Sequence, residues 1–165
     1  MVKIFCINTQ TSCTFPEGTA LMDMLPSFFP EGTSSYPIIA AKVNNVCQGL
    51  KYRAFNSRQV EFLDYTSYAG RSVYCSSLCF LFCKAVKDLF PESRIVLRRP
   101  ISKGYFCELD KGDGSVPCQA DADAVSARMK EMVEADMPFR RHEVRTGEAI
   151  ELFQSLGYDD KVSLL

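Results

Sequence analysis

The sequence has a single histidine, no excess of charge of either sign and no long apolar run. Its 19 Lys and Arg almost balance its 20 Asp and Glu, so no global basic excess favours binding to a phosphate backbone. Because a run of about 18 uncharged apolar residues never occurs, we expect no transmembrane helix. The first residues lack the apolar stretch and the small-residue cleavage site of a signal peptide, so we expect none.

Cysteine, by contrast, is frequent, with eight residues in the chain. Several cysteines lie inside apolar runs, as at residues 5–7, 78–80 and 106–107, where a free thiol behaves as a small apolar side chain. Disulfides are rare in reducing compartments, so this pattern predicts a reduced, cytoplasmic protein.

Cys75, Cys79 and Cys83 follow one another at intervals of four residues. On a helix they share one face, where thiolates could bind a soft metal. Structural zinc takes four ligands, and only Cys107 or Cys118 could complete the set, since no second pair stands at a metal-binding spacing. Packing of small residues against a sheet is the alternative explanation. We favour packing and predict no metal site.

His142 stands beside Arg140 and Arg141, whose charges disfavour its protonated form, and we expect it at the surface. A Cys–His nucleophilic pair is an alternative, but no small-residue turn surrounds any cysteine. Asp121 and Asp123 are expected to complement a helix N-terminus, since they lack the alternating pattern of a calcium loop. No GxxxxGK(S/T), GxGxxG or GxSxG motif occurs, so we predict no catalytic residue and no cofactor in this chain.

Turn and strand signals divide the first 64 residues into a small sheet and one helix. Thr19 is a candidate N-cap for a helix that Pro26 and Pro30 end. Asn44 and Asn45 form a tight turn that accepts positive φ between two strands. The expected strands are residues 2–7, 13–15, 37–43, 46–47 and 59–63. This order of elements predicts a ubiquitin-like β-grasp fold.

Beyond residue 64 the pattern changes to longer helices with a few strands. Residues 72–89 carry almost no charge before Lys84 and no Pro or Gly, which predicts a largely buried helix that Pro91 ends. Residues 121–135 predict an amphipathic helix, and Thr146 is a candidate cap for another that ends at Gly157. The expected strands are residues 95–97, 105–109 and 139–144.

Two segments of the first part resemble a known domain. Residues 15–21 (Phe-Pro-Glu-Gly-Thr-Ala-Leu) and 40–45 (Ala-Ala-Lys-Val-Asn-Asn) are similar to the TGS domain. That domain is a β-grasp fold at the front of threonyl-tRNA synthetases and of some GTPases and stringent-response enzymes. The resemblance implies a TGS-like β-grasp domain over residues 1–64.

The rest of the chain resembles the second additional domain of threonyl-tRNA synthetase, which carries an editing site. The match rests on the helix at residues 76–91 and on the strand Lys-Gly-Tyr-Phe-Cys-Glu-Leu-Asp at 103–110, and it continues in order to residues 161–165. It implies a small α+β editing-domain-like region over residues 65–165 that is truncated at its C-terminus. The chain is therefore expected to be a fragment of a longer protein.

The sequence departs from this family at the metal-binding or deacylating site. The family's helix carries His-x-x-x-His, and the aligned residues here are Ser76 and Phe80. Serine is a poor metal ligand and phenylalanine cannot ligate, so the resemblance implies a degenerate editing site. The family's later Cys-x-x-x-His pair would align beyond residue 165. Lys161 matches a lysine near the synthetase pocket, and with Lys103 and Tyr105 it is a candidate lining of a ligand cleft.

The same two domains, with the histidines replaced, resemble the front of long uridine (nucleoside) kinases of anaerobic bacteria, in which a P-loop kinase domain follows. This resemblance predicts a non-catalytic binding or regulatory module whose partner is the downstream kinase domain. It implies ATP and magnesium as cofactors of the whole protein. A nucleotide or RNA ligand is a further candidate partner, and no membrane is expected. The alternative is part of a threonyl-tRNA synthetase-like protein or an aminoacyl-tRNA editing deacylase.

Overall fold

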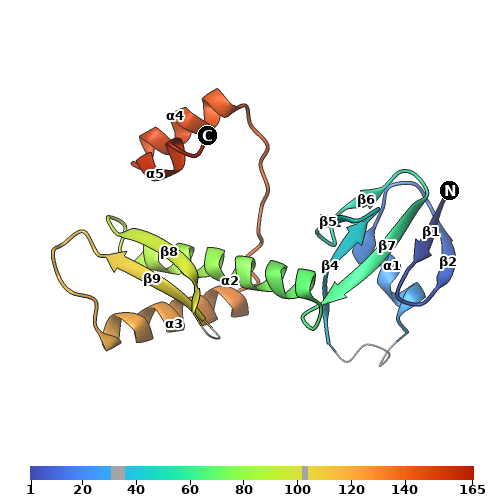
Figure 1. The fold of residues 1–165 in the computed structure, drawn as a ribbon, viewed down its shortest axis with the longest axis horizontal. Coiled ribbons are helices and arrows are strands. Elements are labelled where there is room, and N and C mark those ends of the chain that lie inside the picture. Colours follow the sequence, from blue (N-terminus) through green and yellow to red (C-terminus); the bar gives the residue numbers. More distant parts are fainter. Residues whose placement is uncertain (31–35, 102–103) are drawn as a thin grey trace. The chain divides into compact units, whose positions relative to one another are not determined.

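The computed structural model describes residues 1–30, 36–101 and 104–165, and it confirms the predicted α+β class. The chain divides into two compact units, Met1–Met129 and Lys130–Leu165. Five of the N-terminal strands form one sheet, and the later part is built from helices and one hairpin (Figure 1). The domain boundary expected between residues 64 and 65 stays a prediction, although one strand ends at Asp64 and the next helix begins at Tyr68.

The sheet of the N-terminal part has the strand order β2-β1-β7-β4-β5. Its strands are β1 (Val2–Cys6), β2 (Thr11–Phe15), β4 (Ile38–Val43), β5 (Val46–Gln48) and β7 (Arg58–Asp64). β1 runs parallel to β7, and the other neighbours are antiparallel. The short strands β3 (Thr19–Ala20) and β6 (Arg53–Ala54) pair with each other. A mixed sheet with one helix, α1 (Leu21–Phe28), is the β-grasp arrangement that the sequence predicts (Figure 1).

The core lies between α1 and one face of the sheet, and it follows the alternation of the strands. In β1, Val2, Ile4 and Cys6 are buried whereas Lys3 is exposed. The buried cluster combines strand residues with the inner face of α1: Val2, Ile4, Cys6, Leu21, Met24, Phe28, Ala41, Val43, Ala54, Val60 and Phe62. The other face of the sheet lies outside this core and carries polar side chains such as Lys3.

Two expectations about α1 are wrong. Thr19 does not cap the helix, because its hydroxyl donates to the Pro16 carbonyl (2.7 Å) and the N-cap is Ala20, which makes no side-chain cap bond. Pro26 lies inside the helix rather than ending it. Proline inside a helix costs one backbone hydrogen bond and about 3 kcal/mol. We infer that burial of Leu21, Met24 and Phe28 against the sheet offsets this cost.

The turn between β4 and β5 confirms the sequence prediction. Asn44 and Asn45 have φ values of 47° and 67°, in the left-handed region that asparagine tolerates. The Asn44 side chain also accepts a hydrogen bond from the Gln59 amide (3.0 Å), which ties this turn to the start of β7. The turn therefore contributes to the register of the sheet.

The remainder of the first unit contains α2 (Tyr68–Leu89), the hairpin of β8 (Arg94–Ile101) and β9 (Gly104–Asp110), and α3 (Gln119–Glu134), which runs on past Met129. The prediction that the segment from 72 to 89 is largely buried is wrong. The buried residues of α2 are Gly70, Ala85 and Val86. Low charge alone does not place a side chain in a core, and serine, cysteine and tyrosine occupy many positions of this helix.

The second unit contains α4 (Thr146–Ser155) and the short α5 (Asp159–Val162). The strand expected at residues 139–144 is wrong, since this segment is exposed and has no assigned helix or strand; a strand needs a partner for its backbone groups. Thr146 is the first residue of α4, and Arg145 occupies the cap position. Gly157 has φ 70° just after the helix, as the expected stop. Among the described residues, no helix is both long enough and apolar enough to cross a membrane.

Candidate functional site

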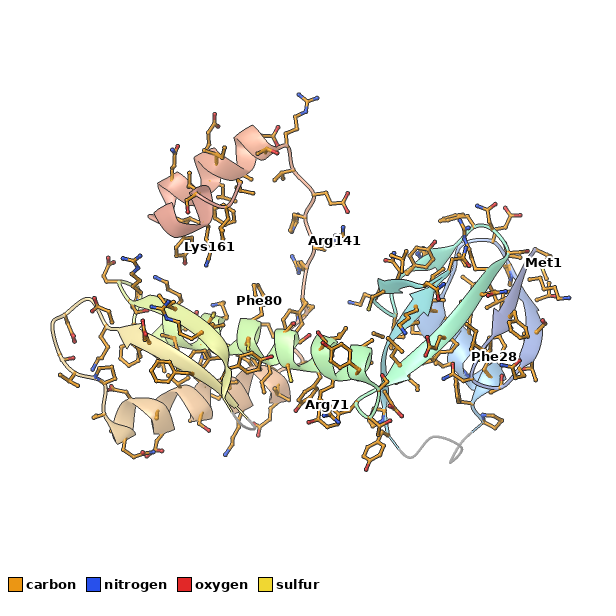
Figure 2. The ribbon with its side chains drawn as sticks, in the orientation of Figure 1. Met1, Phe28, Arg71, Phe80, Arg141 and Lys161 are labelled. Atoms are coloured by element: carbon orange, nitrogen blue, oxygen red, sulfur yellow. The ribbon has the colours of Figure 1, made fainter. Side chains whose placement is uncertain are left out.

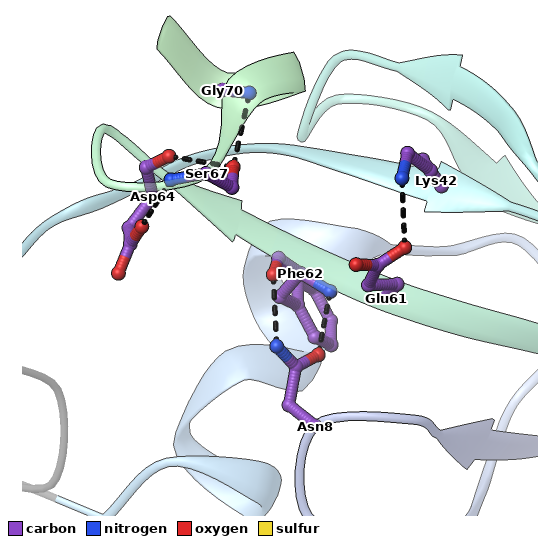
Figure 3. Close-up of polar contacts among 7 residues, drawn as sticks. All are labelled: Asn8, Lys42, Glu61, Phe62, Asp64, Ser67 and Gly70. Atoms are coloured by element: carbon purple, nitrogen blue, oxygen red, sulfur yellow. Dashed lines mark hydrogen bonds and ion pairs between the residues drawn. The ribbon is translucent and has the colours of Figure 1, made fainter.

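The helix that carries the candidate site begins at a polar joint with the sheet. Asp64, at the end of β7, accepts hydrogen bonds from the Thr66 amide (2.8 Å) and hydroxyl (2.6 Å) and from the Ser67 amide (3.3 Å). The Thr66 hydroxyl is the main reason that the pKa of Asp64 lies below its usual value. Ser67 caps α2, because its Oγ accepts from the Gly70 amide (3.0 Å) and donates to the Asp64 carbonyl (3.0 Å) (Figure 3).

Gly70 allows the first turn of α2 to approach the sheet closely. A Cβ atom at this position would lie 1.9 Å from the Asp64 carbonyl oxygen, so any other residue would push the helix away from β7. The helix expected from the sequence begins at residue 72, four residues after the observed start of α2 at Tyr68. The joint was therefore missed.

Ser76 and Phe80 lie one turn apart on the same side of α2, as their spacing predicts. Ser76 is exposed, and Phe80 keeps 65% of its surface exposed. Figure 2 shows the Phe80 ring projecting away from the helix. An exposed phenylalanine can offer an apolar surface, but it cannot hold a metal or transfer a proton. Their assignment as degenerate editing positions rests on the resemblance and stays a prediction.

The candidate cleft residues occupy separate parts of the chain. Tyr105 lies on β9 and is 48% exposed. Lys161 belongs to α5 of the second unit and is exposed. Lys103 lies outside the described residues. A ligand cleft that these three residues would share therefore stays a prediction.

The three cysteines of α2 are partly buried. Burial raises the pKa of the Cys79 thiol, and the neighbouring thiols of Cys75 and Cys107 raise it further. This environment disfavours the thiolate, which is the form that binds metals and acts as a nucleophile. Within residues 1–30, 36–101 and 104–165, no group of three or more His, Cys, Asp or Glu side chains could hold a metal ion. His142 is exposed, as expected for a surface residue.

Ion pairs connect α2 to α3. Asp88 of α2 accepts from both Nη2 (2.8 Å) and Nε (3.1 Å) of Arg128, and it also pairs with Lys84. The hydrogen bond from Lys84, followed by that from Arg128, lowers the pKa of Asp88. These contacts hold the Asp88 carboxylate in place between α2 and α3.

The capping role expected for Asp121 is confirmed at the start of α3. Its carboxylate accepts from the Cys118 amide (2.9 Å), which lowers the pKa of Asp121, and the ion pair with Lys111 (3.1 Å) lowers it further. Asp123 accepts from the Gln119 side chain (2.9 Å). Neither carboxylate stands in a calcium-binding arrangement.

Two hollows on the β-grasp part were missed by the sequence interpretation. The first, of about 430 Å³, is lined by aromatic residues and by Asn8, among others. The Asn8 side chain donates a hydrogen bond to the Phe62 carbonyl (2.9 Å) and accepts one from the Phe62 backbone amide (2.7 Å). The second, of about 610 Å³, is lined by residues of β1, β2, β7 and the turn after β4, among them Lys3 and Phe5. The alternation in β1 places Lys3 and Phe5 on the outer face, and this signal could have located the second hollow.

The whole chain is similar to the N-terminal region of curated threonine–tRNA ligases. It is 29% identical over 151 residues to the protein of Syntrophomonas wolfei, a match that covers 92% of this chain and 23% of the relative. It is 26% identical over 165 residues to that of Clostridioides difficile, which covers 100% of this chain and 25% of the relative. With that of Desulforamulus reducens it shares 28% identity over 127 residues, or 77% of this chain and 20% of the relative.

The chain thus spans about a quarter or less of the length of the curated relatives it matches. No protein-family model matches it. The similarity runs through both the β-grasp part and the region that follows it, which agrees with the resemblance to the two N-terminal domains of threonyl-tRNA synthetases. It gives no support to the expected link with nucleoside kinases.

Proposed function

We propose that this chain is a non-catalytic binding module from a larger protein of the threonyl-tRNA synthetase type, with a degenerate editing site. The observation that carries the proposal is the pair Ser76 and Phe80 on an exposed side of α2, where the resemblance implies two histidines. The similarity over 100% of the chain to the N-terminal quarter of one threonine–tRNA ligase supports the parent type.

The chemistry of α2 supports the loss of hydrolysis. A metal-dependent deacylase needs ligands that hold the ion and leave a position open for water. Serine and phenylalanine supply no such ligand pair. The neighbouring thiol of Cys79 has a raised pKa, so it does not replace the missing histidines with an available thiolate.

Hydrolysis of a mischarged tRNA tests this proposal directly. The purified chain is incubated with a threonine tRNA that has been mischarged with serine, with and without added zinc. The release of serine is then followed over time. We expect the rate to equal that of buffer. An N-terminal synthetase region that retains the histidine pair is the active control. Zinc-dependent hydrolysis by the chain that disappears in Ser76→Ala/Phe80→Leu would show that α2 carries a working site and would refute the proposal.

A nucleoside kinase remains a second candidate for the whole protein. It rests on the resemblance of α2 and of the strand at residues 104–109 to the long uridine kinases, to which the comparisons add no support. In this candidate the module would contact a downstream kinase domain that uses ATP and magnesium. The gene sequence beyond residue 165 separates the two: a GxxxxGK(S/T) loop identifies a kinase, and an aminoacylation domain identifies a synthetase.

A further inference from the structure

The segment 138–145 joins α3 to α4 within the second unit and has no assigned helix or strand. The chain leaves α3 through Asp136, whose φ of 47° is the left-handed conformation of a residue just past a helix. The Met137 amide then donates to the Met132 carbonyl (3.1 Å), the bond that closes a Schellman motif. Pro138 follows, and it cannot extend the helical ladder because it has no backbone N–H. Local sequence therefore ends the helix firmly and starts an irregular segment.

This segment is open to solvent along its whole length. All residues from 133 to 148 are exposed, and the apolar side chains are no exception, since Phe139 keeps 56% and Val144 keeps 55% of its surface exposed. Arg145, the cap residue of α4, has an extended backbone with φ −67° and ψ 148°. Figure 2 places Arg141 on this open stretch of the chain. The backbone here is accessible to another protein.

Two neighbouring guanidinium groups occupy the middle of the segment. Arg140 and Arg141 are both exposed, and the following His142 is exposed as well. Arg141 pairs with Glu143 at 2.7 Å, but the two side chains are 81% and 79% exposed. An ion pair so open to water is weak and separates readily. The pair therefore leaves Arg141 available to a protein that binds arginine.

An exposed arginine on an irregular backbone is what an endoprotease of the trypsin type recognises. Such an enzyme holds the arginine in a pocket that contains an aspartate. It also needs the backbone on both sides of the cut to be free of helix or sheet pairing, so structured segments must open before they are cleaved. Lys130 is also exposed but lies inside α3, and Arg98 lies inside β8. Their backbones meet this requirement only after local unfolding.

We propose that the pair Arg140 and Arg141 is a processing site for a trypsin-like endoprotease. Hydrolysis adds one water molecule across the peptide bond after an arginine: its carbonyl carbon takes the hydroxyl, and the nitrogen of the next residue takes the proton. Cleavage after Arg141 releases residues 142–165, which carry α4, α5 and Lys161. A fragment of fewer than about 40 residues does not keep a stable core of its own. This inference goes beyond the proposed function, because it concerns the second unit and not α2.

Limited digestion of the full chain with a low concentration of trypsin tests the proposal, with the fragments identified by mass spectrometry over time. The first cut should follow Arg140 or Arg141, about tenfold or more faster than a cut after Lys130. The double variant Arg140→Gln/Arg141→Gln should lose this first cut. Lys130→Gln is the matched control, because it removes an exposed cation from a helix, and it should leave the first cut unchanged.

Digestion with chymotrypsin separates the accessibility of the backbone from the charge of the arginines. Phe139 and Phe106 have similar exposure, 56% and 50%, but Phe106 lies in β9, which pairs with β8. The first cut at these two residues should therefore follow Phe139. The proposal is overturned if trypsin cuts first elsewhere, if the double variant keeps the same first cut, or if Phe106 is cut as fast as Phe139. None of these results depends on the hydrolysis of mischarged tRNA, so the two proposals fail separately.

Discussion

The β-grasp part and the helix α2 use apolar residues in different ways. In the β-grasp part, Leu21 and Met24 of α1 and Ile4 of β1 are completely buried. In α2, by contrast, Tyr74, Leu78 and Phe80 are all at least 44% exposed. The β-grasp sheet and α1 bury each other's apolar faces, whereas α2 buries only Gly70, Ala85 and Val86 and is held in addition by a polar joint and by ion pairs. The difference indicates that stability resides in the sheet and that α2 offers surface for contacts.

The largest effect should come from the core of the β-grasp part. Leu21→Ala removes a side chain with no exposed surface and leaves a cavity against the sheet. We expect the free energy of unfolding to fall by about 3 kcal/mol or more, measured by urea denaturation. Met22→Ala is the control on the same helix, since Met22 is 48% exposed, and it should change stability by about 0.5 kcal/mol or less. Equal losses in both variants would contradict the core assignment.

A smaller but clear effect is expected at the joint between the two regions. Gly70→Ala places a Cβ against the Asp64 carbonyl, so the first turn of α2 must shift and its Ser67 cap must weaken. We expect a loss of about 2 kcal/mol in the same urea experiment. Gly49→Ala is the matched control, because a Cβ there meets nothing within 4 Å. A neutral Gly70→Ala variant would show that α2 is not held close to β7.

The ion pairs of Asp88 should contribute less, and their contribution should depend on pH. Asp88→Asn should lower the free energy of unfolding by roughly 0.5 to 1 kcal/mol at neutral pH, since these charges are partly solvent-exposed. Because the folded pKa of Asp88 lies below its ordinary value of 3.8, the contribution is complete above that value. It is lost as the pH falls through the lower folded pKa. The melting temperatures of the unaltered chain and the variant should therefore differ at pH 7 and converge well below pH 3.8. A difference that stays constant with pH would show that the ion pairs of Asp88 do not stabilise the fold.

The smallest effect should come from the candidate site itself. Phe80→Ala removes a side chain that is 65% exposed, so thermal unfolding should show a change of about 0.5 kcal/mol or less. Val86→Ala, on a buried face of the same helix, provides the contrast and should cost more. A large loss for Phe80→Ala would mean that this side of α2 is covered, and the contrast between the two regions would then weaken.

The sequence and the structure agree most closely where a pattern is local. The strand expected at residues 2–7, the Asn44-Asn45 turn and the stop at Gly157 each depend on a few neighbouring residues, and each is confirmed. The strand expected at residues 139–144 is wrong because a strand exists only with a partner. The helix break expected at Pro26 is wrong because buried residues on either side of the proline hold α1 together.

By itself, the sequence determined that the chain is α+β and that its first part is a β-grasp sheet. Those properties follow from residue identity and short-range periodicity. Only the tertiary structure decided that Phe80 is exposed, that Gly70 lies against Asp64 and that Lys3 and Phe5 line one hollow. The physical reason is that burial and close approach depend on which strands become neighbours. Here β1 and β7 lie side by side although more than fifty residues separate them in the chain.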